Sequence, residues 1–436
     1  MEPARPAPDC YIGVDVGTSG CRAVAIDAAG RITAEARVDL PCSRYAYPGA
    51  SEQDPEDWWK AVIEVLSALD APQKGHIRAL SVDATSSTLL LCDQRGDPCS
   101  PALMYDDRRA LAEADEIARL APFDSPARGA TSALAKLLML MRSAPREAAH
   151  ALHQADWING RLTGIFGIAD ENNVLKLGFD PVARRWPDWI ATLGVPPELL
   201  PEVRPVGSPL GTIAQSLARR LGWPNDVRLL AGTTDSNAAT LAAGIDRPGE
   251  AVTSLGSTLV VKLFSDRPIF AARYGVYSHR IGDHWLTGGA SNSGGAVLRQ
   301  YFSDSELEEL SGHIDPGRPL DLHYYPLIVA GERFPESDPN KQPFLEPRPQ
   351  ARHAFLQAML EGIADIEAAG YARLAELGAP FPQRVFSAGG GAANAAWRAI
   401  REHKLGVPVL TARHSESAYG AALIARGAFR SVATPS

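Results

Sequence analysis

The sequence has few cysteines and no long apolar run, and each of these shortages excludes a class of protein. Five of its 436 residues are cysteine, and no C-x-x-C pair with nearby histidines completes a zinc site. The odd number of cysteines, together with an N-terminal segment that lacks the apolar core of a signal peptide, predicts reduced thiols in a cytoplasmic protein. No stretch approaches the roughly 18 consecutive apolar residues of a membrane span, so no membrane partner is expected.

Positive charge is also scarce. The chain has 43 Lys and Arg against 51 Asp and Glu, a formal net charge of −8, and no basic run marks a nucleic-acid-binding surface. A nucleotide would therefore have to be held by backbone N–H groups and a metal. The 45% hydrophobic and 22% charged residues are typical of a soluble globular enzyme. The length exceeds one ordinary core, so we expect two domains, with a boundary close to residues 225–227.

One stretch organises the rest of the chain: an apolar strand that ends in Gly232–Asp235 and opens a helix of small residues. Such a turn presents backbone N–H groups and hydroxyls to an anion, but its carboxylate would repel a phosphate. Asp235 therefore fits the acceptor side of phosphoryl transfer, where it would take the proton of a hydroxyl. A helix N-cap is the purely structural alternative for Asp235.

The same pattern occurs near the start of the chain, where an apolar strand ends in Asp15 and a Gly-Thr-Ser turn. Two further glycine- and hydroxyl-bearing turns lie at 254–258 and 387–392, each directly after an apolar strand. We expect the four turns to converge in a cleft between two domains. The hydroxyl-rich turn at 83–87 either points into the same cleft or is a plain solvated turn.

Several elements are predicted by local patterns. Strands at 21–27 and 31–40 complete a meander with the first strand. Asp54-Pro55 opens a helix to about residue 69, and longer helical patterns cover 354–377 and 418–427.

Two other enzyme classes use related turns. Aspartic proteases place an Asp-Thr-Gly turn in each half, but neither acidic turn here has that pattern, and the helices argue against an all-β fold. The turn at 389–394 follows a strand and precedes a helix, as in dinucleotide-binding dehydrogenases, but its spacing is not G-x-G-x-x-G. Three glycines there suit close approach to an adenine or ribose equally well.

The motifs in order resemble those of the FGGY carbohydrate kinase family, over essentially the full length. The landmarks are Gly13–Ser19, Glu52–Pro55, Trp58-Trp59, Gly232–Asp235, Ser254–Thr258, Ala388–Gly391 and Ala418–Ala422. Within the family the chain most resembles the compact, xylulose-kinase-like D-ribulose kinases of plants and cyanobacteria, through Asp156-Trp157, Asn172–Gly178 and Gly331–Pro335.

The resemblance implies an α/β protein of two actin-like (ribonuclease H-like) ATPase domains with a nucleotide and sugar cleft between them. Residues 1–226 would form the sugar and metal side, and residues 227–436 the nucleotide side with the general base. A chaperone ATPase of the same fold is disfavoured because no peptide-binding domain follows.

On the sugar side, the resemblance assigns Asp235 as the general base on the sugar hydroxyl. Asp15 would hold Mg²⁺ through water. The substrate-contacting positions would be Asp15, Ser86, Asp235 and Ser236.

On the nucleotide side, the resemblance implies ATP as the phosphoryl donor. Thr18 and Ser19 would lie near the transferred phosphate, and Gly256, Ser257 and Thr258 would meet the nucleotide phosphates. Gly390, Gly391, Asn394 and Trp397 would line the adenosine site, with Trp397 stacking on the base.

The substrate is expected to be a ketopentose, with D-ribulose first, D-xylulose second and a polyol such as ribitol or glycerol third. Tyr105-Asp106-Asp107 departs from the tryptophan-containing motif common in xylulose kinases, which leaves the identity of the sugar open. The sequence does not indicate an oligomeric state.

Overall fold

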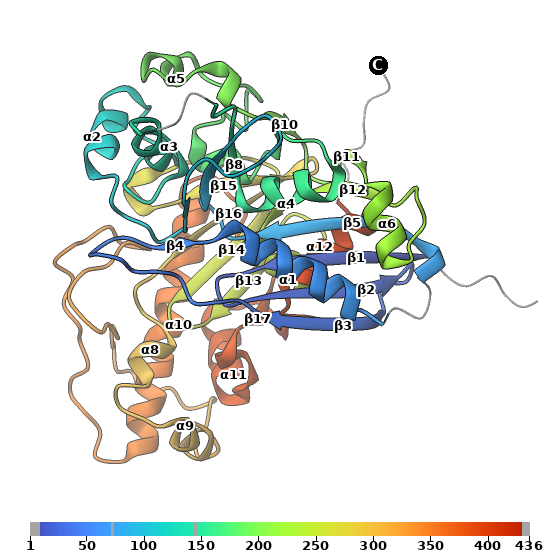
Figure 1. Cartoon of the computed structure of the whole chain (residues 1–436). Coiled ribbons are helices and arrows are strands. Elements are labelled where there is room, and N and C mark those ends of the chain that lie inside the picture. The colour runs from blue at the N-terminus through green and yellow to red at the C-terminus, as the bar shows by residue number, and fades with distance from the viewer. Residues whose placement is uncertain (1–8, 71–73, 144–146, 430–436) are drawn as a thin grey trace, which may run out of the picture. The chain divides into compact units, whose positions relative to one another are not determined.

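The structure is a computed structural model that describes residues 9–70, 74–143 and 147–429 (Figure 1). The described residues fall into two compact units. Unit 1 comprises those within Met1–Leu241, His279–Asp283 and Glu416–Ser436, and unit 2 comprises Ala242–Ser278 and His284–Ser415.

Unit 1 is built on a mixed sheet. Its strands run in the order β11 (Pro209–Thr212), β12 (Arg228–Thr234), β5 (Ile77–Ala84), β1 (Cys10–Val16), β2 (Gly20–Asp27) and β3 (Ile32–Asp39). β1, β2 and β3 form the antiparallel meander that the sequence predicts, and β5 pairs in parallel with both β1 and β12. Since β12 belongs to this sheet, Asp235 lies in unit 1, and not in a second domain beginning at residue 227.

Alternation along β1 gives the sheet two apolar faces. Ile12 and Val14 are fully buried in the core that also contains Trp58 and Val62 of helix α1 (Pro55–Ala68). The intervening Gly13 faces helix α12 (Ser417–Arg426). α1 begins as predicted, because the Asp54 side chain accepts the Glu56 N–H and Pro55 occupies the first turn.

Helix α12 approaches the sheet as closely as backbone allows. A Cβ atom on Gly13 would lie 1.9 Å from the Ala418 carbonyl oxygen, and one on Gly420 would lie 1.9 Å from the Ala238 carbonyl oxygen. The glycine in each landmark is therefore required by helix–strand and helix–helix contact.

We expect Gly13→Ala to lower the free energy of unfolding of the chain by more than about 3 kcal/mol, because the new methyl group meets backbone that cannot rotate away. Urea unfolding followed by circular dichroism measures the effect. Gly75→Ala is the matched control, because no atom lies within 4 Å of its added Cβ. Equal stability of the two variants would contradict the packing of α12 on β1.

Other elements of unit 1 surround this sheet. One smaller sheet has four strands, in the order β4 (Glu52–Gln53), β7 (Ala102–Leu103), β6 (Leu89–Cys92) and β8 (His150–His153). Another has two strands, β10 (Glu202–Arg204) and β9 (Ile168–Asp170). The remaining α-helices are α2 (Leu111–Leu120), α3 (Ala133–Met141), α4 (Gln154–Thr163), α5 (Asp188–Thr192), α6 (Gln215–Leu221) and α7 (Asp235–Ala242), whose last residue belongs to unit 2. Short 3₁₀ helices are η1 (Lys74–His76), η2 (Asn173–Leu177) and η3 (Pro197–Leu199).

Unit 2 is built on a second sheet with the order β15 (Tyr277–Ile281), β16 (His284–Ala290), β14 (Leu259–Ser265), β13 (Glu250–Leu255), β17 (Arg384–Ala388) and β18 (Val409–Thr411). Residues 279–281 of β15 belong to unit 1. β13, β14 and β16 form an antiparallel meander, and β17 pairs in parallel with β13 and β18. Its helices are α8 (Gly295–Leu298), α9 (Asp304–Ser311), α10 (Arg352–Glu376), α11 (Ala395–Leu405), η4 (Ala272–Tyr274) and η5 (Gly390–Ala393).

The sequence pattern indicates a repeat in which the strand before Asp235 corresponds to the first strand of the chain. The strand orders of the two sheets show a different correspondence. The run β12-β5-β1-β2-β3 corresponds in order and direction to β18-β17-β13-β14-β16. The counterpart of β1 is therefore β13, and not the strand before Asp235. The Gly232–Asp235 turn matches the first turn in composition only, because β12 occupies the position that β18 has in unit 2.

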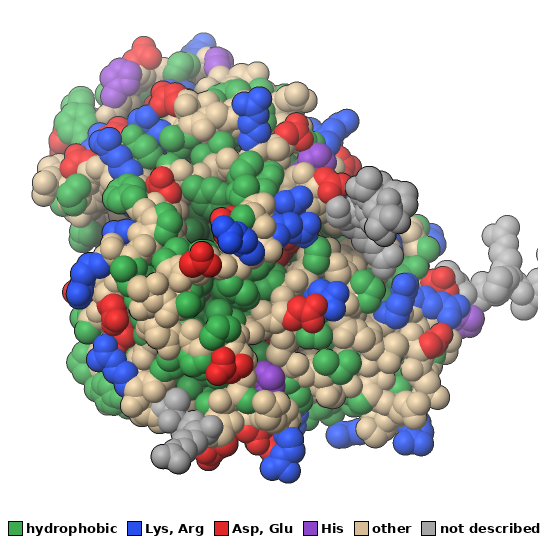
Figure 2. Space-filling view, turned by 90° about the horizontal axis from the view of Figure 1, so that it is seen from above, with side chains coloured by type: hydrophobic (Ala, Val, Ile, Leu, Met, Phe, Trp, Pro, Cys, Tyr) green, Lys and Arg blue, Asp and Glu red, His purple; other side chains and the backbone are tan. Residues whose placement is uncertain are grey.

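The surface carries charges of both signs. Figure 2 shows basic and acidic side chains interspersed over the face drawn, with hydrophobic side chains between them. Among the helices that the structure describes, none combines the length and hydropathy needed to cross a membrane. The five cysteines are all described and all unpaired.

Candidate active site

Three strands of unit 1 end at one edge of the sheet, and the predicted sugar-side residues follow these ends. Asp15 is at the end of β1, Ser86 is in the turn after β5, and Asp235 begins α7 directly after β12. The carboxyl ends of β1, β5 and β12 meet because these strands are parallel, and such edges are the usual ligand sites of α/β sheets. The same edge also carries Thr18 and Ser19, in the turn between β1 and β2, and Ser236 in α7.

Three carboxyl groups influence one another at this edge. Burial raises the pKa of Asp15 to about 6, and the charge of Asp235 adds to the rise. Asp83 stands opposite Asp15 in the register of β5 and β1 and is fully buried. Burial raises the pKa of Asp83 well above its ordinary value, and the charges of Asp15 and Asp235 raise it further. The site therefore concentrates negative charge.

Arg22 is the cation beside this cluster. Its Nη1 atom lies 3.4 Å from Asp15 Oδ2 and 3.4 Å from Glu416 Oε2. Asp15 and Arg22 are register partners on β1 and β2, and Glu416 caps the start of α12. The sequence placed Asp83 in the hydroxyl-rich turn at 83–87 without giving its carboxyl group a role, and it did not single out Arg22. Pairing the predicted hairpin strands residue by residue would have placed Arg22 opposite Asp15.

The carboxyl cluster suits a divalent cation of the Mg²⁺ kind. Mg²⁺ is usually held by one or two protein carboxylates and keeps several waters. Asp15 supplies a carboxylate beside two further carboxyl groups, those of Asp83 and Asp235, and beside the cation Arg22. The part of the chain that the structure describes has no group of three or more His, Cys, Asp or Glu side chains arranged to hold a metal. A mostly hydrated ion at Asp15 is consistent with both observations.

Asp235 is oriented by its own helix and by the strand before it. Its Oδ1 atom accepts the Ser236 N–H at 2.6 Å. Two residues earlier, the Thr233 hydroxyl accepts the Asn172 side-chain amide at 2.9 Å and the Asn237 amide at 3.2 Å. The end of β12 is thereby fixed from two sides, which holds the first turn of α7 in place.

Asn172 is held in turn by a buried acid. Asp170 accepts the backbone N–H groups of Asn172 and Asn173, each at 2.9 Å, and the Asn173 side-chain amide at 2.6 Å. Burial raises the pKa of Asp170 to about 7, the charge of Asp156 adds to the rise, and the hydrogen bonds from Asn173 and Asn172 oppose it.

This shift predicts a pH-dependent stability. An Asp whose pKa is raised in the folded chain holds its proton at pH values where the unfolded chain has lost it. Folding is therefore favoured at low pH, and the contribution of Asp170 is lost as pH rises from about 4 to about 7, by at most about 1.4 kcal/mol per pH unit. We expect Asp170→Asn to remove this slope. Urea unfolding from pH 5 to pH 8 tests it, and parallel stability curves for both proteins would contradict it.

A loop between β7 and α2 reaches the same edge. Burial raises the pKa of Tyr105, the charge of Asp106 raises it further, and the hydrogen bond to the Thr18 side chain lowers it. The charge of Asp235 also acts on the phenol of Tyr105, a residue that is 46% exposed. Tyr105 thus belongs beside Thr18 and Asp235, although the sequence identified it only as a departure from a family motif.

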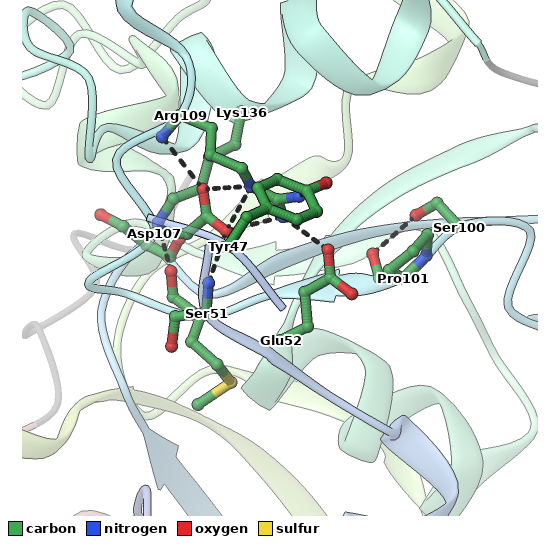
Figure 3. A network of polar contacts seen from close by, with 10 residues as sticks. Tyr47, Ser51, Glu52, Ser100, Pro101, Asp107, Arg109 and Lys136 are labelled. Atoms are coloured by element: carbon green, nitrogen blue, oxygen red, sulfur yellow. Dashed lines mark hydrogen bonds and ion pairs between the residues drawn. The ribbon is translucent and has the colours of Figure 1, made fainter. Parts of the chain in front are cut away.

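The far end of this loop is anchored by Arg109. Arg109 Nη2 lies 2.7 Å from Asp107 Oδ2 and 2.6 Å from Glu52 Oε1, and Nη1 donates to the Tyr47 hydroxyl at 2.7 Å. The Ser51 N–H donates to Asp107 Oδ2 at 2.9 Å. In Figure 3 the Arg109 side chain joins Asp107 to Glu52, with the Tyr47 ring beside it.

Unit 2 contains a pocket of about 920 Å³ at the carboxyl ends of its own parallel strands. Six of the seven residues predicted to bind the nucleotide in unit 2 line it: Gly256, Ser257, Gly390, Gly391, Asn394 and Trp397. Thr258, the seventh, is not among the lining residues. Leu255, Leu298 and Leu307 supply apolar walls, and Arg299, Asp304 and Glu308 supply charge. The volume of this pocket, the glycines in its wall and its mixture of apolar and charged side chains are suitable for a nucleotide.

One side of this pocket is the start of α11. Asn394 caps the helix by accepting the Trp397 N–H at 2.9 Å, and its Nδ2 atom donates to Ser311 Oγ at 2.7 Å. The helix N-terminus suits an anionic or polar ligand. A Cβ atom on Gly391 would lie 2.5 Å from the Trp397 ring, which is 2% exposed. Trp397 is therefore part of the buried wall, and little of its ring is open for stacking.

Comparison with known proteins identifies two family models along the chain. Residues 10–242 match the N-terminal domain of the FGGY family of carbohydrate kinases, and residues 251–429 match its C-terminal domain. The chain is 28% identical to the glycerol kinase of Gloeobacter violaceus, covering 91% of this chain and 84% of that protein. It is 25% identical to the xylulose kinase of Escherichia coli, covering 89% and 83%.

A solved structure shows the same fold. The crystal structure described as a xyloylose kinase from Brucella ovis superposes with a TM-score of 0.86 at 26% identity, covering 96% of this chain and 90% of that one. The expected two-domain α/β fold of the actin-like sugar kinases is confirmed.

Proposed function

Since the chain belongs to the FGGY family of carbohydrate kinases, we propose that it transfers the γ-phosphoryl group of ATP to a hydroxyl of a ketopentose, with D-ribulose as the first choice and D-ribulose 5-phosphate as the product. The observation that carries this proposal is the placement of Asp15 and Asp235 at one sheet edge of unit 1. A glycine-lined pocket of nucleotide size in unit 2 supports it.

In this mechanism Asp235 is the general base. Its carboxylate takes the proton of the sugar hydroxyl as the oxygen attacks the phosphorus atom, and a positioned base contributes about 10²–10⁴ in rate. The Ser236 N–H and the fixed end of β12 hold the carboxylate in one orientation. Ser86 and Ser236 follow β5 and β12 and offer hydroxyls to the sugar.

The charges at the transferred phosphoryl group would be balanced from the end of β1. Mg²⁺ bound to Asp15 and water would neutralise phosphate charge when present. Arg22 holds Asp15 from the neighbouring strand and offers a positive charge of its own. The backbone of the turn containing Thr18 and Ser19, and that of Gly256–Thr258, would contact phosphate oxygens through N–H groups.

D-Xylulose and a polyol are the alternative acceptors. Both alternatives are supported by the relatives of the chain that are named xylulose kinase and glycerol kinase. The segment Tyr105-Asp106-Asp107, whose Tyr105 lies within the influence of the Asp235 charge, would decide between these substrates.

Release of ADP from Mg-ATP across ketopentoses, aldoses and polyols tests the proposal. We expect the highest kcat/KM with D-ribulose and no comparable release without a sugar. A higher kcat/KM with D-xylulose or glycerol would show that this compound is the acceptor in place of D-ribulose. Phosphoryl transfer from ATP to a hydroxyl would remain the proposed reaction. No stimulation by any sugar or polyol would refute the kinase activity.

A further inference from the structure

We propose that Lys136 is a positioning residue that sets the affinity for the sugar by joining two segments of unit 1, the turn at residues 85–88 and the loop at residues 104–107. The inference rests on the proposed function and adds to it a determinant of substrate affinity remote from the reacting atoms.

Lys136 is a buried cation with no exposed surface. It projects from α3, and its Nζ atom donates to the Ser87 carbonyl at 2.9 Å and to the Met104 carbonyl at 2.7 Å. Burial lowers the pKa of the ammonium to about 7, whereas the charge of Asp107 opposes the shift. A lysine buried at this cost joins two backbone segments just beyond the place where β6 and β7 pair, at Leu89 and Leu103.

The first segment needs such support. Ser87 has φ 68°, in the left-handed region that costs a non-glycine residue roughly 1–2 kcal/mol. Thr85 Oγ1 lies 2.6 Å from Thr88 Oγ1 and donates to Gln154 Oε1 at 2.7 Å. The turn that carries Ser86 is thus held by side chains from outside it, with Lys136 bonded at its strained residue.

The second segment is held at both of its ends. Lys136 fixes the Met104 carbonyl, and Arg109 and the Ser51 N–H fix Asp107 (Figure 3). The residues between these anchors are Tyr105, which interacts with Thr18 and Asp235, and Asp106. Together with the turn's own hydrogen bond, from the Asp107 N–H to the Met104 carbonyl at 3.0 Å, the two anchors determine where Tyr105 and Asp106 lie relative to the general base.

Each joined segment also contains a buried oxygen without a partner. Ser87 Oγ and Asp106 Oδ1 are buried and have no hydrogen-bond partner among the described residues. Buried polar atoms are normally paired, so neither oxygen helps to hold its segment, and the Lys136 link is the contact that the two segments share. Without the link, both segments could shift, and the ligand would lose pre-positioned partners while Asp235 remained in place.

The test compares steady-state kinetics of the wild type and Lys136→Met with D-ribulose and Mg-ATP. We expect the KM for the sugar to rise at least tenfold and kcat to change by less than threefold. The affinity for a non-hydrolysable ATP analogue should stay within twofold, because the pocket of unit 2 contains none of these residues. The milder Lys136→Gln, which keeps one amide donor, should give an intermediate KM, and it is judged by the same criteria where Lys136→Met fails to fold.

Arg161→Met separates positioning from general loss of stability. Arg161 pairs with Glu56 and lies over the rings of Trp59 and Trp157, and these contacts involve neither segment. Its removal should lower the melting temperature but leave the sugar KM within twofold. A wild-type KM in the folded Lys136 variants, or an equal rise in Arg161→Met, would overturn the inference. A wild type without sugar-dependent turnover would instead refute the proposed function.

Discussion

Replacing Asp235 by asparagine is expected to lower sugar-dependent turnover by about 10²–10⁴-fold, because the variant cannot accept the proton of the attacking hydroxyl. The substitution keeps the shape of the side chain at the start of α7. ATP binding should be unchanged, since Asp235 belongs to unit 1 and the pocket proposed for the nucleotide is lined by residues of unit 2. Coupled measurement of ADP release, with equilibrium binding of an ATP analogue, separates the two effects.

The matched control is Asp39→Asn. Asp39 ends β3 in the same unit, and its side chain is 82% exposed beside Arg37. This variant should keep the wild-type kcat and KM. If Asp235→Asn also kept wild-type turnover, the base would have to be another group.

The second large effect concerns the stability of unit 2. Glu367 of α10 and Arg401 of α11 form an ion pair with side-chain exposures of 0% and 1%, and Arg401 Nη2 donates to Glu367 Oε1 at 2.7 Å. Thr253 of β13 donates to the same carboxylate, and Ser387 of β17 accepts from Arg401. The pair therefore ties two helices to the two strands that end in the glycine turns of the nucleotide pocket.

We expect Arg401→Met to lower the free energy of unfolding by about 3–5 kcal/mol, because it leaves the Glu367 carboxylate buried without its cation. Adding Glu367→Leu to Arg401→Met should recover part of this loss, since two apolar side chains need no partner. Urea unfolding of both single variants and of the double variant measures the coupling. Strictly additive losses would show that the two charges do not depend on each other.

Local elements of both units follow from local sequence patterns. The meander β1–β2–β3, the Asp54-capped helix α1, and the strands on either side of Gly256–Thr258 are all confirmed. These elements are set by alternation, caps and tight turns, which involve residues close together in the chain.

The pairing of strands that lie far apart in the sequence could not be predicted from such local patterns. The strand before Asp235 joins the first sheet because β12 pairs with β5, and more than a hundred residues separate these two strands in the sequence. The sequence therefore placed Asp235 on the wrong side of the boundary. The sequence predicted the turn that begins at Asp83 but not the pairing of Asp83 with Asp15, and it missed Lys136, for the same reason: these roles come from contacts with distant segments.

The most direct test of the account is the phosphorus NMR spectrum of the products formed from Mg-ATP and D-ribulose by the wild-type chain. The account predicts one phosphomonoester, formed on a hydroxyl oxygen of the sugar, for each ADP produced, with no matching release of inorganic phosphate. A spectrum that contains ADP and inorganic phosphate, without a sugar phosphate, would show that water rather than a sugar hydroxyl is the acceptor.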